Sequence, residues 1–86
     1  MRHELKTMTK YFRDVESGVK TFEVRRNDRN FQVGDTLVLR EWIPPGKWVE
    51  QYTGDGYTAK EIEKDVMYIL DDPAYVKEGY VILGFA

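Results

Sequence analysis

The segment Gly-Val-Lys-Thr-Phe-Glu-Val-Arg at positions 18–25 joins a helical pattern to a strand pattern, and we expect the fold to be organised around it. In an extended chain, successive side chains point to opposite faces. This alternation predicts that Phe22 and Val24 face the core, whereas Glu23 and Arg25 face outward. The sequence therefore predicts a dense group of opposite charges at a helix–strand junction.

Two interpretations of these charges are open. Charges on an exposed strand face are most often solvated, and a surface ion pair contributes only about 0–1 kcal/mol. Alternatively, Lys20, Glu23 and Arg25 form a ligand site, because Lys20 stands at the mouth of the turn and can swing toward the other two. Lys20 and Arg25 can bind phosphates, and Arg25 can do so through two parallel hydrogen bonds. Glu23 can accept a hydrogen bond from a base or hold Arg25 in position.

The order Gly-x-Lys-x-x-Glu-x-Arg resembles the signature of ASCH domains, which belong to the PUA-like β-barrels. Within that group the chain resembles the short bacterial and phage family DUF3850, through segments 3–6, 20–29, 31–42 and 79–85. PUA-like domains generally hold RNA or a modified base in a cleft near the junction of helix and strand. The resemblance therefore implies an RNA-binding or nucleotide-binding domain with Lys20, Glu23 and Arg25 in its cleft.

The resemblance also implies an alternative function. Some ASCH proteins resemble small amidohydrolases that act on N4-acylated cytidine with a lysine, a hydroxyl and a carboxylate. Lys20 matches that lysine and would be the catalytic residue. The match is incomplete, because Glu23 occupies the position of the hydroxyl and no spacing selects Glu61 or Glu63 as the later carboxylate. A third alternative, a phage or bacterial protein-interaction module, is neither favoured nor opposed by any sequence feature.

Charge is unevenly distributed along the chain. Between Lys20 and Arg40 there are five basic and three acidic residues, whereas between Glu50 and Asp72 there are two basic and seven acidic residues. We therefore expect a polyanion such as RNA to meet the first half of the chain. Three further residues are candidates for ligand contact. Arg26 can extend the basic edge, and Trp48 is a candidate for stacking on a base. Arg40 lies between apolar neighbours on a strand and can face Glu23 and Arg25, as a buried pairing partner or as a ligand contact.

Length and composition limit the other possibilities. The 86 residues predict one domain, residues 1–86, near the small end of what folds without metal or disulfide support. No cysteine and one histidine argue against a disulfide framework and against a metal site, and no cofactor is expected. The net charge of −2 lacks the basic footprint usual for nucleic-acid binding. No apolar run typical of a signal peptide or membrane span is present, so we expect a cytoplasmic protein.

The pattern of apolar residues predicts an α+β fold that is mainly β. We expect a helix that is capped by Thr7 or Thr9 and ends at Gly18, and a mobile loop over 47–57. Strands are expected at 3–6, 20–26, 36–43, 58–70 and 79–85, with a helix over 59–64 as the competing prediction. Five or six mostly antiparallel strands in so short a chain predict a small PUA-like barrel, since closure removes exposed sheet edges.

Overall fold

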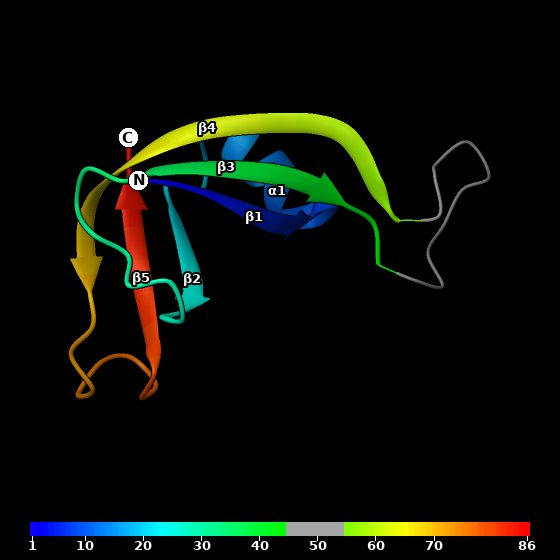
Figure 1. Ribbon diagram of the computed structural model, residues 1–86. Helices are drawn as coiled ribbons and strands as arrows, with labels where there is room; N and C mark the ends of the chain where they lie inside the picture. Colours follow the sequence, from blue (N-terminus) through cyan, green and yellow to red (C-terminus); the bar gives the residue numbers. More distant parts are fainter. Residues whose placement is uncertain (45–54) are drawn as a thin grey trace.

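A computed structural model describes residues 1–44 and 55–86 of the chain (Figure 1). The elements in chain order are β1 (Arg2–Met8), α1 (Thr9–Glu16), β2 (Phe22–Arg26), β3 (Thr36–Trp42), β4 (Tyr57–Leu70) and β5 (Tyr80–Phe85). This confirms a mainly β fold with one helix near the amino terminus. The segment 59–64 belongs to a strand, so the competing helix prediction is wrong. Most of the expected loop over 47–57, including Trp48, lies outside the described residues.

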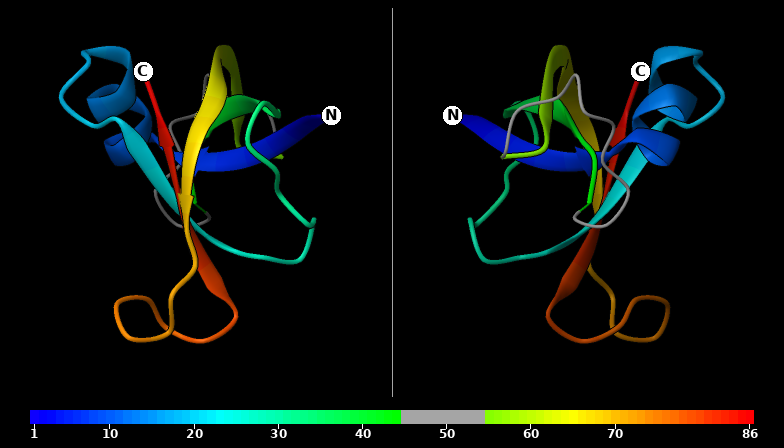
Figure 2. Two further views of the ribbon diagram at one scale, coloured as in Figure 1. Left: turned by 90° about the vertical axis from the view of Figure 1, so that its left-hand side faces the viewer. Right: turned by 90° about the vertical axis from the view of Figure 1, so that its right-hand side faces the viewer.

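The five strands form one sheet in the order β1-β3-β4-β5-β2. The β1–β3 pair is parallel and the other three pairs are antiparallel. The long strand β4 pairs with β3 as far as Asp65 and with β5 from Val66 onward. At this change the backbone of Val66 bonds to both Gly34 and Asp35, each at 2.8 Å. The sheet consequently turns along β4, and β5 and β2 run steeply across the direction of β3 (Figures 1 and 2).

The sheet does not close into a barrel, so that expectation is wrong. Strands β1 and β2 are its two ends and do not pair with each other. Two guanidinium groups occupy the opening instead. Arg25 Nη2 donates to the carbonyl oxygen of Lys6 at 2.9 Å, and Arg29 Nη1 donates to that of Glu4 at 2.7 Å. These alternate carbonyls lie on the edge of β1 that faces away from β3. We call the opening between β1 and β2 the seam.

The core fills the angle between the two halves of the sheet. Alternate residues of β3 and β5 point into it. Phe12 and Val15 of α1 pack on the same cluster and are almost completely buried. The remaining buried members come from β1, the β2–β3 connection and the three central strands: Leu5, Phe31, Leu37, Leu39, Val66, Val81, Leu83 and Phe85.

The two ends of α1 differ in how well they were predicted. Met8 stands at the N-cap without a side-chain hydrogen bond, so neither threonine caps the helix. At the other end the amide of Gly18 bonds to the carbonyl of Val15 at 3.0 Å, and Gly18 has a φ of +86°. This is the positive φ expected of a residue that follows a helix. The chain therefore turns sharply, and the Lys20 amide bonds back to Asp14 at 3.0 Å.

Candidate functional site

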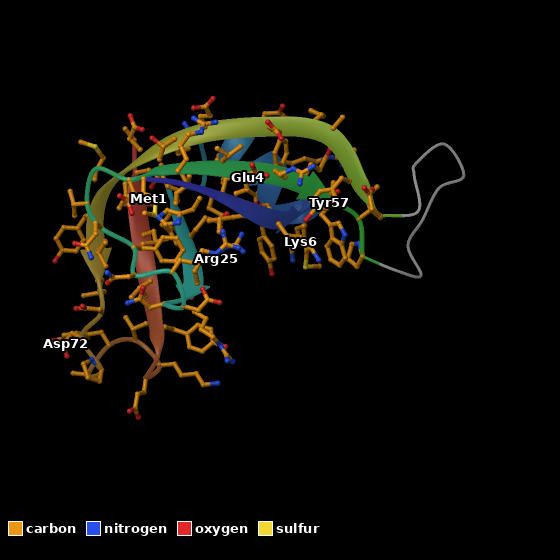
Figure 3. All side chains as sticks on the ribbon, in the orientation of Figure 1. Met1, Glu4, Lys6, Arg25, Tyr57 and Asp72 are labelled. Atoms are coloured by element: carbon orange, nitrogen blue, oxygen red, sulfur yellow. The ribbon has the colours of Figure 1, made fainter. Side chains whose placement is uncertain are left out.

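The face of β2 that points toward the core is not the predicted one but the opposite one. Glu23 is only 5% exposed, whereas Phe22 and Val24 are 41% and 50% exposed. The prediction failed because alternation identifies two faces but does not say which is buried. As an end strand beside the seam, β2 directs Glu23 and Arg25 inward, where Lys20 and backbone carbonyls of β1 can receive them. The side chain of Arg25 lies between β2 and β1 in Figure 3.

The predicted trio of charges comes together in a short chain of ion pairs. Lys20 Nζ lies 3.4 Å from Glu23 Oε1, and Arg25 Nε lies 3.7 Å from Glu23 Oε2. Both separations are too long for strong charge-assisted hydrogen bonds. Lys20 Nζ donates instead to the carbonyl oxygen of Phe22 at 2.8 Å. Within the described part of the chain, Glu23 Oε1 and Arg25 Nε are buried and have no hydrogen-bond partner.

A cavity of about 410 Å³ lies beside this cluster and is lined by Tyr11, Lys20, Phe22, Glu23 and Val24. We call it the Lys20 pocket. The ammonium group of Lys20 is 5.4 Å from the centre of the Tyr11 ring and 5.0 Å from that of the Phe22 ring. The pocket therefore combines two aromatic rings, a cation and a buried carboxylate whose Oε1 lacks a donor.

Sequence reasoning did not assign either aromatic ring to the site. Phe22 was expected in the core, and Tyr11 was not among the candidate site residues. An eight-residue helix with Phe12 and Val15 fully buried leaves Tyr11 at the margin of its apolar face, 42% exposed. That helical position was the available signal for Tyr11. The signal for Phe22 appears only when β2 is known to be an end strand.

A second cavity, of about 150 Å³, lies in the seam and is lined by Leu5, Arg25, Arg26, Asp28, Arg29 and Phe31. We call it the seam pocket. Burial lowers the pKa of Arg25, nearby Glu23 opposes this change, and the positive charge of Arg29 lowers the pKa further. Three arginines and one aspartate thus line this small pocket.

The other predicted contact residues lie elsewhere. Arg26 lines the seam pocket, and a hydrogen bond with Tyr80 raises the pKa of its exposed guanidinium. Arg40 does not reach Glu23 or Arg25. Its guanidinium lies 4.0 Å from the centre of the Tyr57 ring and pairs with Glu61 at 3.3 Å and with Glu4 at 3.7 Å. Trp48 lies outside the described residues.

Two further properties concern only the part of the chain that the structure describes. It contains no group of three or more histidine, cysteine, aspartate or glutamate side chains placed to hold a metal ion. Its helix has neither the length nor the apolar character needed to cross a membrane.

Comparison with known proteins identifies the family. The model of the family described as "Domain of unknown function (DUF3850)" matches residues 2–85. The chain is also 35% identical, over 81 residues, to the uncharacterized 12.9 kDa protein in the GpA 3′ region of Escherichia phage P2. The alignment includes 94% of this chain but spans only 64% of the phage protein. With nearly its whole length matched, the chain belongs to the DUF3850 family.

Proposed function

We propose that the protein binds RNA, or a nucleotide-sized piece of it, with one base in the Lys20 pocket. The observation that carries this proposal is that Glu23, which lines the cavity, has a buried Oε1 atom with no hydrogen bond among the described residues, its ion-pair neighbour Lys20 Nζ lying 3.4 Å away. A buried acceptor without a partner costs about 1–3 kcal/mol. An N–H group on the edge of a base would supply the missing donor. This contact would give Glu23 a role in binding, which a phosphate could not give it because both groups are anions.

The remaining walls of the Lys20 pocket suit the other surfaces of a base. Tyr11 and Phe22 offer ring faces, and stacking on an aromatic side chain is worth about 1–3 kcal/mol per base. Lys20 has three N–H donors and directs one to the Phe22 carbonyl. Another can donate to a carbonyl oxygen or ring nitrogen of the base. Donor, acceptor and stacking surfaces therefore converge on one cavity.

The resemblance to ASCH and other PUA-like domains supports this proposal, because those domains hold RNA or modified bases near a helix–strand junction. We place the chain in that superfamily as part of the proposal. The hydrolase alternative receives no comparable support. None of the described side chains that line the Lys20 pocket carries an aliphatic hydroxyl group. No observation favours the interaction module, so binding is the function we propose.

The proposal is tested by fluorescence anisotropy with a labelled ten-nucleotide single-stranded RNA of mixed sequence and a labelled RNA hairpin, at 50 and 200 mM salt. We expect the single strand to bind and its affinity to fall with salt, because basic residues contact phosphates. Tyr11→Ala should weaken binding about 5- to 100-fold, the equivalent of one lost stack. Lys20→Ala should also weaken it. Tyr75→Ala is the matched control, since Tyr75 is 79% exposed and does not line the Lys20 pocket.

Two results would overturn the proposal. One is the absence of binding to either RNA at 50 mM salt. The other is an unchanged affinity in both Tyr11→Ala and Lys20→Ala, which would place any bound RNA elsewhere on the protein. Incubation with N4-acetylcytidine in the same buffers tests the alternative, and release of cytidine that depends on Lys20 would favour hydrolysis.

A further inference from the structure

The arginines of the seam pocket have more N–H donors and more positive charge than their contacts with β1 require. Arg25 and Arg29 each donate to a neutral backbone carbonyl, and Arg25 also donates to the hydroxyl of Thr7 at 3.2 Å. These contacts use Nη2 of Arg25 and Nη1 of Arg29. A guanidinium group has five N–H donors in a fixed fork. In the described part of the chain, Nε and Nη1 of Arg25 and Nε and Nη2 of Arg29 make no hydrogen bond.

The charge in this pocket is also incompletely neutralised. Three arginines and one aspartate line it, so the lining residues carry two excess positive charges, although the Arg26 guanidinium itself lies 5.7 Å from the centre of the Tyr80 ring. The charge of Arg29 acts against ionisation of Arg25, which shows that the two cations repel each other there. An anion would relieve this repulsion.

We propose that the seam pocket binds a phosphate group through Arg25 and Arg29, with Arg26 at the margin of the pocket. Arginine forks match the oxygens of a phosphate with two parallel hydrogen bonds. Leu5 and Phe31 line the same pocket and give it apolar walls beside the arginines. This separates two roles on β2, with Glu23 bordering the Lys20 pocket and Arg25 bordering the seam pocket.

The positions of the two pockets suggest that one ligand occupies both. Glu23 and Arg25 are two residues apart on the same face of β2, which corresponds to about 7 Å along a strand. A nucleotide places its phosphate at a comparable distance from its base. The assignment of base and phosphate to one nucleotide rests on the proposed function, whereas the phosphate site itself rests only on the seam pocket.

The test compares the four ribonucleosides, their 5′-monophosphates and inorganic phosphate by isothermal titration and by arginine Nε–H signals in nitrogen-15 spectra. We expect at least one monophosphate to bind about tenfold or more tightly than its nucleoside, and to shift the signals of Arg25 and Arg29. Arg29→Gln should remove that advantage and leave nucleoside affinity within about twofold. Asp28→Asn should increase monophosphate affinity, because it removes the one carboxylate in the pocket.

Arg2→Gln is the matched control, since Arg2 pairs with Glu63 at 2.7 Å away from the seam pocket. Amide spectra establish that each variant is folded. Arg26→Gln provides a second variant at an exposed arginine. Equal affinity for nucleosides and monophosphates, or an advantage that survives in Arg29→Gln and Arg26→Gln, would overturn the inference while leaving the proposed function intact. If no nucleoside or nucleotide binds but inorganic phosphate shifts the Arg25 and Arg29 signals, the phosphate site stands and the proposed function fails. If phosphate also leaves them unchanged, both fail.

Discussion

Arg25 Nη2 reaches across the seam to the carbonyl oxygen of Lys6 at 2.9 Å, and in doing so joins the first strand of the sheet to the last (Figure 3). The contact connects residues that are 19 positions apart in the chain. An unpaired strand edge offers carbonyl and amide groups to any other extended chain. Arg25 and its neighbour Arg29 each donate to a carbonyl oxygen of β1, so these two side chains protect the edge in place of a partner strand.

The first prediction concerns the stability of the seam. Arg25→Gln should lower the free energy of unfolding by about 1.5–3 kcal/mol, the usual worth of a hydrogen bond to a charged group, because it also weakens the pairing of buried Glu23. Arg29→Gln should cost less, about 0.5–1.5 kcal/mol, since Arg29 is exposed. Arg26→Gln is the control and should stay within about 0.5 kcal/mol. Urea denaturation measures all three, and equal stability of Arg25→Gln and Arg26→Gln would contradict the bridging role.

Strands were predictable where only one face is apolar enough to form the core. In β5, the alternate residues Val81, Leu83 and Phe85 are buried while Ile82 is only partly so, which follows the two-residue period of the strand. In such strands the hydrophobic effect and the backbone period agree, so local sequence suffices.

The orientation of β2 could not be obtained in this way. Its apolar pair, Phe22 and Val24, favours one face, but the charged pair on the other face meets partners from distant parts of the chain. Arg25 reaches β1, and Arg29 of the β2–β3 connection lies close enough to influence its pKa. The open seam has the same origin, because the pairing of chain ends depends on long-range contacts that no local period encodes. The charged residues of the site were recognisable from their order, whereas their inward direction was not.

The second prediction concerns the strength of the Lys20–Glu23 pair. Its atoms are 3.4 Å apart, farther than the 3.1 Å of the Lys60–Glu16 pair, but its side chains are 16% and 6% exposed rather than 53% and 47%. Low solvent exposure strengthens Coulomb interactions more than this difference in distance weakens them. A double-mutant cycle with Lys20→Met and Glu23→Gln should give a coupling energy of at least about 1 kcal/mol. The equivalent cycle at Lys60 and Glu16 should give less than about 0.5 kcal/mol. The reverse order would show that the buried pair is ineffective.

The third prediction follows from the outward direction of Val24. Because this side chain is 50% exposed, Val24→Thr should change the free energy of unfolding by no more than about 0.5 kcal/mol. Val81 lies opposite Arg25 on the neighbouring strand and is 1% exposed. Val81→Thr places a hydroxyl in the core and should cost at least about 1–3 kcal/mol. Thermal and urea unfolding of the two variants make the comparison. A larger loss in Val24→Thr would restore the orientation that the sequence suggested.

The last prediction concerns acid. A hydrogen bond with His3, whose Nε2 lies 2.8 Å from Asp35 Oδ2, and a second from the backbone of Gln32 lower the pKa of Asp35 from 3.8 to about 2. Because the folded-state pKa lies below the ordinary value, this stabilisation is complete above about pH 4 and is lost as the pH falls toward 2. Asp35→Asn should therefore lower stability at pH 5 and remove part of the decline between pH 4 and pH 2.

Glu63 provides the matched control for this prediction. A hydrogen bond and the charge of Arg2 also lower the pKa of the Glu63 carboxyl, but both side chains of that pair are 60% exposed. Solvent screens exposed pairs, so Glu63→Gln should alter the acid profile less than Asp35→Asn does. Urea midpoints measured from pH 5 to pH 2 make the comparison. A wild-type profile in Asp35→Asn would mean that the His3–Asp35 contact, which fixes the start of β1 to the residue preceding β3, contributes nothing to acid stability.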